Sequence, residues 1–212
     1  MSKPDNPKPE NTKPTRPFVV VRDDGPNAAA LRGAVVAIGN FDGVHRGHRS
    51  VIERALNRAR EGGKPAAVMT LEPHPRSYFR PDARLFRLSD ERQKLRLLAA
   101  SGLDGAVVLT FNAALAGLPA EEFVRRILIE RLAVSGVAIG FDFHFGQGRG
   151  GSPAFLKEAG ERFGFPVDIV PPLEDEGRPV SSGTIRTALE AGRVVEAAEG
   201  NFWQRLVDLV TH

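Results

Sequence analysis

Short apolar runs alternate along this chain with longer stretches in which apolar residues recur every three or four positions. Five runs rich in Val, Ile and Ala are typical of buried strands, and they lie at 34–38, 66–70, 106–110, 137–140 and 167–170. Stretches with helical spacing lie at about 46–60, after Ser89, after Pro119, at 153–163 and at 181–191. This alternation predicts an α/β fold, a doubly wound parallel sheet of about five strands with helices on both faces.

The two ends of the chain differ in pattern from its middle. Residues 1–17 hold five prolines and no apolar periodicity, which predicts a disordered tail. A short apolar run at 18–21 is a further strand candidate, and residues 18–192 are expected to form one Rossmann-like domain. A helical pattern from about 194 to 210 predicts that residues 193–212 form a helical extension.

The first buried run leads into the turn G-N-F-D-G at 39–43, and a helix that carries H-R-G-H at 45–48 follows. Two imidazoles three residues apart share one side of the helix's first turn. Backbone N–H groups without helical partners and the positive end of the helix dipole also lie there. Gly47 has no Cβ, so a ligand can approach the backbone there. These features suit a phosphate chain. Two solvated histidines, or a metal pair, remain alternatives, although zinc is disfavoured because the chain has no Cys.

Two further loops follow strand-like runs and should meet the first at the carboxyl ends of a parallel sheet. The glycine-rich loop at 141–151 contains Asp142 and Phe145. The motif S-S-G-T-I-R at 181–186 puts hydroxyls and Arg186 at a helix start, where they can bind phosphate oxygens. An ordinary helix cap with a solvated arginine is the alternative. The sequence lacks a Walker A motif, and no G-x-G-x-x-G follows the first strand.

Three prolines stiffen residues 72–88, and they predict a loop without regular structure. The loop is richer in aromatic residues than the chain as a whole, and Phe79 is one of three. Such rings either grip a flat ligand or pin the loop to the core, and the residues leave both interpretations open. Ser89 is expected to cap the helix that follows.

Composition narrows the class of protein. The chain has 212 residues, no Cys and a net charge of +3. Four basic against two acidic residues in 1–17 account for +2 of this charge, and no basic stripe with interleaved aromatics is present. The sequence has no apolar run of transmembrane length and no apolar signal segment near its start. We therefore expect a cytoplasmic protein without a membrane or nucleic-acid partner.

Four motifs together resemble those of the FMN adenylyltransferase (FAD synthetase) module of bacterial bifunctional riboflavin kinase/FAD synthetases, which are H-x-G-H nucleotidyltransferases. The motifs are G-N-F-D-G-V-H-R-G-H, E-P-H-P, G-F-D-F-H-F-G and S-S-G-T-I-R, within a resemblance that spans about residues 34–192. The resemblance implies in-line transfer of AMP from ATP to FMN, which gives FAD and pyrophosphate, with Mg²⁺ bound to ATP.

The resemblance also implies roles for individual residues. The residues implied in catalysis are His45, His48 and Arg186. Those implied in ATP binding are Gly39, Asn40, Phe41, Asp42, Gly47, Ser182 and Thr184. Those implied in flavin or substrate binding are Pro73, Pro75, Phe79, Asp142 and Phe145. No protein ligand to a metal is implied.

The chain departs from the family pattern in two places. Its last motif has Gly183 where the family more often has Thr or Ser, which leaves open which hydroxyl meets the phosphate. E-G-N-F-W at 199–203 stands where the family continues with an L-G-R-P-like segment into a riboflavin kinase barrel. Riboflavin kinase activity is therefore expected to be absent, with the 193–212 extension in place of that domain. The alternatives are an adenylyl- or cytidylyltransferase for another phosphorylated acceptor, and a non-catalytic nucleotide- or RNA-binding protein.

Overall fold

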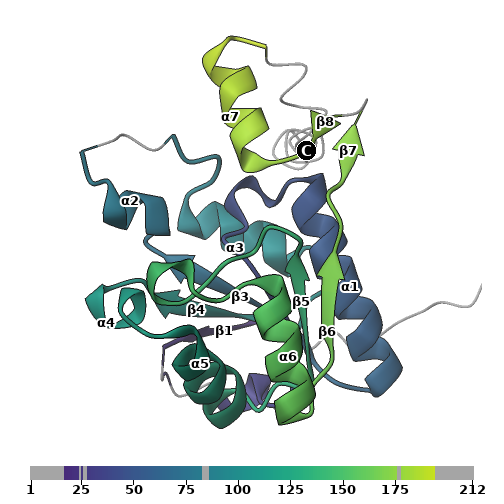
Figure 1. Ribbon diagram of the computed structural model, residues 1–212. Coiled ribbons are helices and arrows are strands. Elements are labelled where there is room, and N and C mark those ends of the chain that lie inside the picture. Colours follow the sequence, from purple (N-terminus) through teal and green to yellow (C-terminus); the bar gives the residue numbers. More distant parts are fainter. Residues whose placement is uncertain (1–16, 24, 26–27, 83–85, 176–177, 194–212) are drawn as a thin grey trace, which may run out of the picture.

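The computed structural model describes residues 17–23, 25, 28–82, 86–175 and 178–193. Its main sheet has six parallel strands in the order β1-β4-β3-β2-β5-β6 (Figure 1). The strands are β1 (Val19–Arg22), β2 (Val35–Ile38), β3 (Ala66–Glu72), β4 (Gly105–Thr110), β5 (Gly136–Gly140) and β6 (Val167–Val170). The doubly wound α/β prediction is confirmed, and the 18–21 candidate joins the sheet as β1.

Strand order reverses beside β2. Val35 of β2 pairs with Ala66 of β3 on one side and with Gly136 of β5 on the other. From β2 the chain moves outwards through β3 and β4, then returns across the sheet to β5 and β6. Open α/β sheets bind ligands outside the carboxyl ends of their strands at such a reversal. The turn that follows β2 therefore stands where a ligand is expected.

Seven α-helices are described. They are α1 (Arg46–Gly62), α2 (Pro75–Phe79), α3 (Glu91–Ala99), α4 (Ala113–Ala116), α5 (Ala120–Phe123), α6 (Pro153–Phe163) and α7 (Ser182–Glu190). Short 3₁₀ turns lie at Ala28–Leu31, Asp42–Val44 and Gln147–Arg149, and π-type turns extend α5 over Val124–Arg131. No helix among the residues just given is long and apolar enough to span a membrane.

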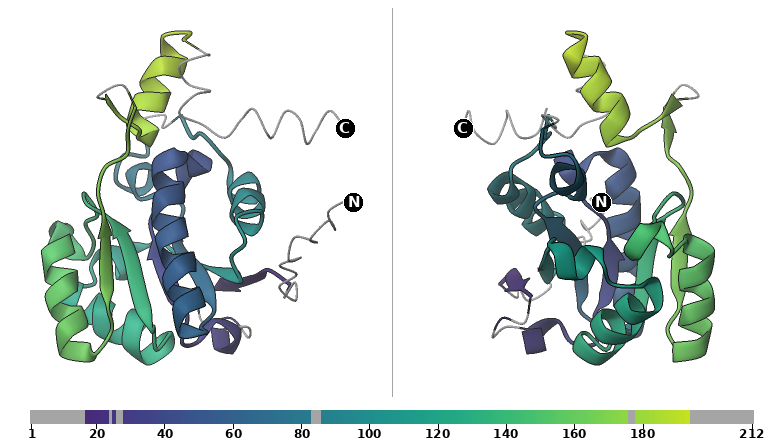
Figure 2. Two further views of the ribbon diagram at one scale, coloured as in Figure 1. Left: turned by 90° about the vertical axis from the view of Figure 1, so that its right-hand side faces the viewer. Right: turned by 60° about the vertical axis from the view of Figure 1, so that its left-hand side comes forward.

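Alternate residues of the central strands enter two separate apolar cores. Val36 and Ile38 of β2 pack in the core that contains α5 and α6. Val35 and Ala37 pack in the core that contains α1 and α3. Figure 2 shows α1 and α6 on opposite sides of the sheet. Because both faces are covered, the strand needs apolar residues at every position, which explains its uninterrupted apolar run.

α7 lies beyond the carboxyl ends of the strands, together with the small hairpin of β7 (Glu174–Asp175) and β8 (Arg178–Pro179) (Figure 1). It packs through a third apolar cluster, which is separate from the two cores and consists of Leu88, Ile185 and Ala188. The S-S-G-T-I-R motif thus begins a helix, as predicted, and this helix meets the end of the 72–88 segment.

Two local predictions are wrong. α3 is capped by Asp90, whose carboxylate accepts the Gln93 N–H at 2.7 Å, and not by Ser89. Ser89 is buried and instead donates its N–H to Asp42. The 72–88 segment does contain regular structure, the short helix α2, which begins at Pro75. A proline is tolerated in a first turn because its missing N–H would have no helical partner there.

The predictions for the chain ends remain predictions. The disordered tail at 1–17 falls outside the described residues except for residue 17. The helical pattern at 194–210 also falls outside them.

Candidate active site

The turn after β2 is built around a buried phenylalanine. Phe41 adopts a left-handed conformation, with φ 49°, and its ring packs in the α1 core. A Cβ on Gly39 would lie 3.3 Å from this ring, so the glycine makes room for it. Phe41 therefore supports the nucleotide turn, residues 39–43, from the side of the core.

His45 and His48 form a stacked pair at the start of α1. His45 caps the helix, because its Nδ1 accepts the backbone N–H of His48 at 3.3 Å. The ring centroids lie 3.6 Å apart with an interplanar angle of 25°. An Nδ1 that accepts a hydrogen bond leaves the proton of a neutral ring on Nε2. The Nε2 atom of His45 is therefore a hydrogen-bond donor.

Gly47 allows residue 180 to approach the histidine pair. A Cβ at Gly47 would lie 2.9 Å from the carbonyl oxygen of Val180 and 3.2 Å from the ring of His45. Close packing of the chain therefore requires this glycine, in addition to the approach of a ligand that the sequence suggested.

Both histidines are held in the neutral form. The pKa of His45 is lowered to about 4, mainly by burial; Asp42 opposes the shift, and the nearby positive charge of Arg186 contributes to it. Burial is also the main reason that the pKa of His48 lies well below its ordinary value, and His45, Lys94 and Arg186 add to this effect. Near neutral pH the pair can therefore donate hydrogen bonds without carrying charge.

Asp42 is a buried carboxylate surrounded by donors. It accepts the N–H groups of Leu88 at 3.2 Å and Ser89 at 3.0 Å, and Arg186 Nη2 lies 2.5 Å from its Oδ2. Burial alone would raise the pKa of Asp42, but the hydrogen bonds from Arg186 and these two amides outweigh it and lower the pKa. The carboxylate therefore stays charged, and it fixes Arg186 in place. Arg186 Nε also donates to the carbonyl oxygen of Phe86 at 2.8 Å.

The hydroxyls at the start of α7 differ in their contacts. Ser181 is the N-cap, with its Oγ accepting the Thr184 N–H at 3.1 Å and lying 2.8 Å from Thr184 Oγ1. Ser182 Oγ donates to the backbone carbonyl of Asp42 at 3.1 Å. Two parts of the sequence separated by 140 positions thus meet at the nucleotide turn. The alternative interpretation of the motif, an ordinary helix cap with a solvated arginine, is thus correct for the cap, which Ser181 provides, but wrong for Arg186, which is buried.

Three aromatic rings gather beside this cluster of polar groups, at the carboxyl ends of β3 and β4. Tyr78 and Phe79 of α2 and Phe111 after β4 contact one another edge to face, with centroid distances of 5.3–5.6 Å. Phe79 is 65% exposed, which disfavours the interpretation that its ring pins the loop to the core. Sequence reasoning missed Phe111, whose position directly after a strand's carboxyl end was the available signal.

Phe145 and Asp142 lie apart from these contacts. The ring of Phe145 is buried against Phe123, Phe143 and Phe155, in the core that contains α5 and α6. Gly151 permits this packing, since a Cβ there would lie 2.6 Å from the Phe145 ring. Asp142 is exposed. The structure therefore gives Phe145 a role in packing, and its substrate role remains a prediction.

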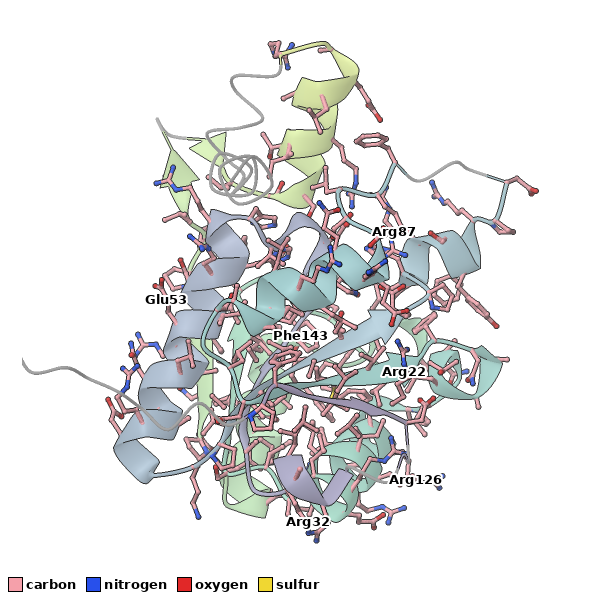
Figure 3. All side chains as sticks on the ribbon, turned by 180° about the vertical axis from the view of Figure 1, so that it is seen from behind. Arg22, Arg32, Glu53, Arg87, Arg126 and Phe143 are labelled. Atoms are coloured by element: carbon pink, nitrogen blue, oxygen red, sulfur yellow. The ribbon has the colours of Figure 1, made fainter. Side chains whose placement is uncertain are left out.

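A buried ion cluster beneath the nucleotide turn was not predicted. Lys94 is 1% exposed, and its Nζ lies 2.7 Å from Glu72 Oε1. Arg87 binds the same carboxylate at 2.7 Å, and Figure 3 shows Arg87 beside α3. The available signal was spacing, because Lys94 stands three and four residues before the buried Leu97 and Leu98 and so shares their face of the helix.

His74 was quoted within the E-P-H-P motif but was not predicted as a site residue. Its Nδ1 accepts the Arg76 N–H at 3.1 Å and so caps α2. The pKa of His74 is lowered to about 4, mainly by burial; Asp42 opposes the shift, and Arg186, Arg87 and Lys94 contribute to it. His74 therefore lies within electrostatic reach of the Asp42–Arg186 pair.

Within the described ranges, no group of three or more His, Asp or Glu side chains could hold a metal ion. The two buried carboxylates near the histidines, Asp42 and Glu72, are already paired with cationic side chains.

The family model and the curated relatives that match this chain agree on one family. The family model described as FAD synthetase matches residues 27–184. The bifunctional riboflavin kinase/FMN adenylyltransferase of Pseudomonas fluorescens is 44% identical over 160 residues, and that of Escherichia coli K12 is 38% identical over 161. Each match covers 76% of this chain and 51% of the relative, so the chain spans about half the length of these curated relatives.

Two further matches extend this result. A relative from Geobacillus thermodenitrificans is 37% identical over 163 residues, which cover 76% of this chain and 86% of the relative. Among solved structures, a crystal structure described as a macrolide-efflux protein from Streptococcus pneumoniae superposes with a TM-score of 0.74 at 30% identity. That match covers 86% of this chain and 60% of the other.

Proposed function

The chain belongs to the FAD synthetase family, and on that premise we propose that it transfers AMP from ATP to FMN, giving FAD and pyrophosphate. The observation that carries the proposal is the stacked, neutral pair of His45 and His48 at the start of α1, with the buried Arg186 close enough to lower both pKa values. Helix-start amides, neutral donors and a fixed guanidinium together suit the phosphates of a nucleotide.

In the proposed reaction, a phosphate oxygen of FMN forms a bond to the α-phosphorus of ATP. The bond from that phosphorus to the oxygen bridging the β-phosphate breaks, and pyrophosphate leaves with the electron pair. Phosphoryl chemistry of this kind needs little covalent help from a protein. A helix dipole contributes only about 0.3–2 kcal/mol, whereas positioning two substrates can supply roughly 7–11 kcal/mol. Positioning is therefore the main task of this site.

The site residues divide this task. His45 donates from Nε2, and His48 lies against it, so both can hydrogen-bond to the phosphates while these gain negative charge. Arg186 supplies a positive charge that Asp42 and the Phe86 carbonyl hold in one direction. Mg²⁺ would enter with ATP as part of the substrate and would offset the negative charge of its phosphates.

The acceptor would bind on the aromatic side. Tyr78 and Phe79 are exposed, and together with the half-buried Phe111 they offer ring surface to a flat, largely apolar ring system such as that of a flavin. Pro73 and Pro75 stiffen the backbone that carries two of these rings. The segment from 72 to 79 therefore sets where the acceptor's phosphate points.

The decisive experiment mixes purified chain with Mg²⁺, a nucleotide and one acceptor at a time, and measures pyrophosphate and FAD. We expect pyrophosphate and FAD in equal amounts from ATP and FMN. If pyrophosphate is released only with CTP or only with another phosphorylated acceptor, the chain is still a nucleotidyltransferase, but the proposed transfer of AMP from ATP to FMN is wrong. Binding of ATP without turnover of any acceptor would favour the non-catalytic alternative.

A further inference from the structure

Lys94 lies beneath the proposed active site and contacts two of its segments. Its Nζ donates to Thr70 Oγ1 at 2.9 Å and to the backbone carbonyl of Asn40 at 3.3 Å, and it pairs with Glu72 Oε1 at 2.7 Å. An ammonium group has three N–H donors, and these three oxygens account for all of them.

Burying a charged lysine is costly unless the charge is paired and hydrogen-bonded. An apolar residue could fill the same space between Leu97, Leu98 and the sheet, as it does elsewhere along the helix. Hydrophobic packing therefore does not explain a lysine at this position, whereas its polar partners suggest a more specific role.

These partners belong to the two halves of the proposed reaction. Asn40 lies in the nucleotide turn, which leads directly to His45. Glu72 is the last residue of β3 and the first residue of the segment 72–79, called here the acceptor segment because it carries Tyr78 and Phe79. Thr70 reinforces the first contact, since its hydroxyl also donates to the Asn40 carbonyl at 3.1 Å.

We propose that Lys94 is a positioning residue for adenylyl transfer, whose ammonium group holds the nucleotide turn against the start of the acceptor segment. This inference rests on the proposed function and deepens it. Lys94 contacts neither substrate; it sets the distance between the two backbone segments that bind them. A misplacement of about 1 Å in such a geometry can cost about 100-fold in rate.

The charge of Lys94 also acts on His48. The groups that influence the His48 ring are His45 at the N-cap of α1, Lys94 on α3 and Arg186 on α7, and all three lower its pKa in addition to burial. Lys94 itself faces Glu72, Arg87 and Asp42. Removing Lys94 therefore moves the pKa of His48 upward, towards its ordinary value.

Arg87 provides a matched control. It binds the same Glu72 carboxylate at 2.7 and 3.0 Å, so Arg87→Met also removes one cation from the cluster. Among the described residues, the hydrogen bonds of Arg87 go to Glu72, whereas those of Lys94 also reach the nucleotide turn. The two variants thus separate the loss of an ion pair from the loss of the link.

The experiment compares wild type, Lys94→Met and Arg87→Met in ATP binding alone, FMN binding alone, and the single-turnover rate. For Lys94→Met we expect a rate about 100-fold lower, with both dissociation constants within about threefold of wild type. As the pH is lowered, the rate of this variant should also begin to fall at a higher pH than that of wild type, because the pKa of His48 is raised. For Arg87→Met we expect a rate within about threefold of wild type, and the rate should fall at the same acidic pH as in wild type.

Wild-type rate in Lys94→Met, or an equal rate loss in Arg87→Met, would overturn the positioning role. A wild-type protein that transfers no AMP to FMN would instead refute the proposed function, so the two failures are distinguishable. If Lys94→Met does not fold, Thr70→Val decides, because it is nearly isosteric and removes one contact to Asn40. We expect Thr70→Val to lose about tenfold in rate with unchanged binding, and a wild-type rate there would overturn the inference.

Discussion

Arg186 and Asp42 form a buried ion pair between residues 144 positions apart, with Nη2 2.5 Å from Oδ2. Their side chains are 10% and 2% exposed. The pair joins α7 to the nucleotide turn, and the Ser182 hydroxyl adds a second bond to the same turn. α7 packs on a separate small apolar cluster, so these polar contacts carry much of its attachment.

Replacing Asp42 by Asn should therefore destabilise the protein strongly. Removing one partner of a buried pair leaves the other charge uncompensated, and the expected loss in free energy of unfolding is about 3 kcal/mol or more. Urea unfolding measures it. Asp168→Asn is the control, because its partner Arg58 is 34% exposed, and a loss of no more than about 1 kcal/mol is expected. Equal losses in the two variants would contradict the proposed importance of burial.

The histidine pair should be essential for turnover. In His48→Ala the stacked partner of His45 and one phosphate donor are lost, and we expect the rate of pyrophosphate release to fall about 100- to 1,000-fold. His144→Ala is a suitable control, because His144 is an exposed histidine whose Nδ1 lies near the Asp142 carbonyl. If both variants keep the wild-type rate, the site has been misassigned.

Stability should fall as the solution becomes acidic, well before the carboxylates titrate. His45 and His74 both have a pKa of about 4 in the folded protein, against 6.5 for an ordinary histidine. Between these values the unfolded chain binds more protons than the folded one, so the free energy of unfolding rises with pH. For His45 the expected loss from pH 7 to pH 4 is about 3 kcal/mol.

Urea unfolding at several pH values between 7.5 and 4 tests this expectation. His45→Asn should reduce the pH dependence in that window. Asp42 and Glu72 also have lowered pKa values, and they lose their stabilising contribution as the pH falls through those values. A flat profile from pH 7 to pH 5 would show that the histidines are not held neutral by burial.

Replacing Phe79 should weaken binding of the acceptor without changing the stability of the fold. Because its ring is 65% exposed, Phe79→Ala removes little buried surface, while stacking on a flat ring is worth enough to raise the KM for FMN about tenfold. The KM for ATP and the urea midpoint should stay close to wild type. Phe163→Ala, on α6, is the control, and an equal rise in KM there would remove the case for a specific aromatic site.

The sheet could be predicted from the sequence because the apolar runs of its central strands fit few other secondary structures. All four residues of β2 are buried, and an uncharged run before a glycine-bearing turn fits a parallel strand buried on both faces. His45 and His48 could be placed for the same reason, since their position depends on that local strand–turn–helix order. The contact of Arg186 with the nucleotide turn was expected from topology, although its partner Asp42 was not.

The remaining features depend on contacts between distant residues. Ser89 precedes an acidic first turn, as a capping serine often does, but its N–H and hydroxyl are hydrogen-bonded to the buried Asp42 carboxylate instead. The spacing of Lys94 from Leu97 and Leu98 indicates that it lies on the buried face of its helix. Nothing near it in the sequence identifies Asn40 and Glu72 as its partners. Phe145 follows a strand like a site residue, and only the packing of three other rings shows that it lies in the core.

Thr184 should provide the hydroxyl that meets a phosphate of ATP. The Ser181 hydroxyl caps α7 and the Ser182 hydroxyl donates to the Asp42 carbonyl, and both side chains are partly buried. The Thr184 side chain is exposed on the first helical turn, and its Oγ1 lies 2.8 Å from Ser181 Oγ. A hydrogen bond to a charged group is worth enough that Thr184→Val should raise the dissociation constant for ATP about tenfold. Ser181→Ala should instead lower the free energy of unfolding by about 1 kcal/mol. Calorimetric titration with ATP and urea unfolding separate the two effects, and the assignment fails if Ser182→Ala weakens ATP binding while Thr184→Val does not.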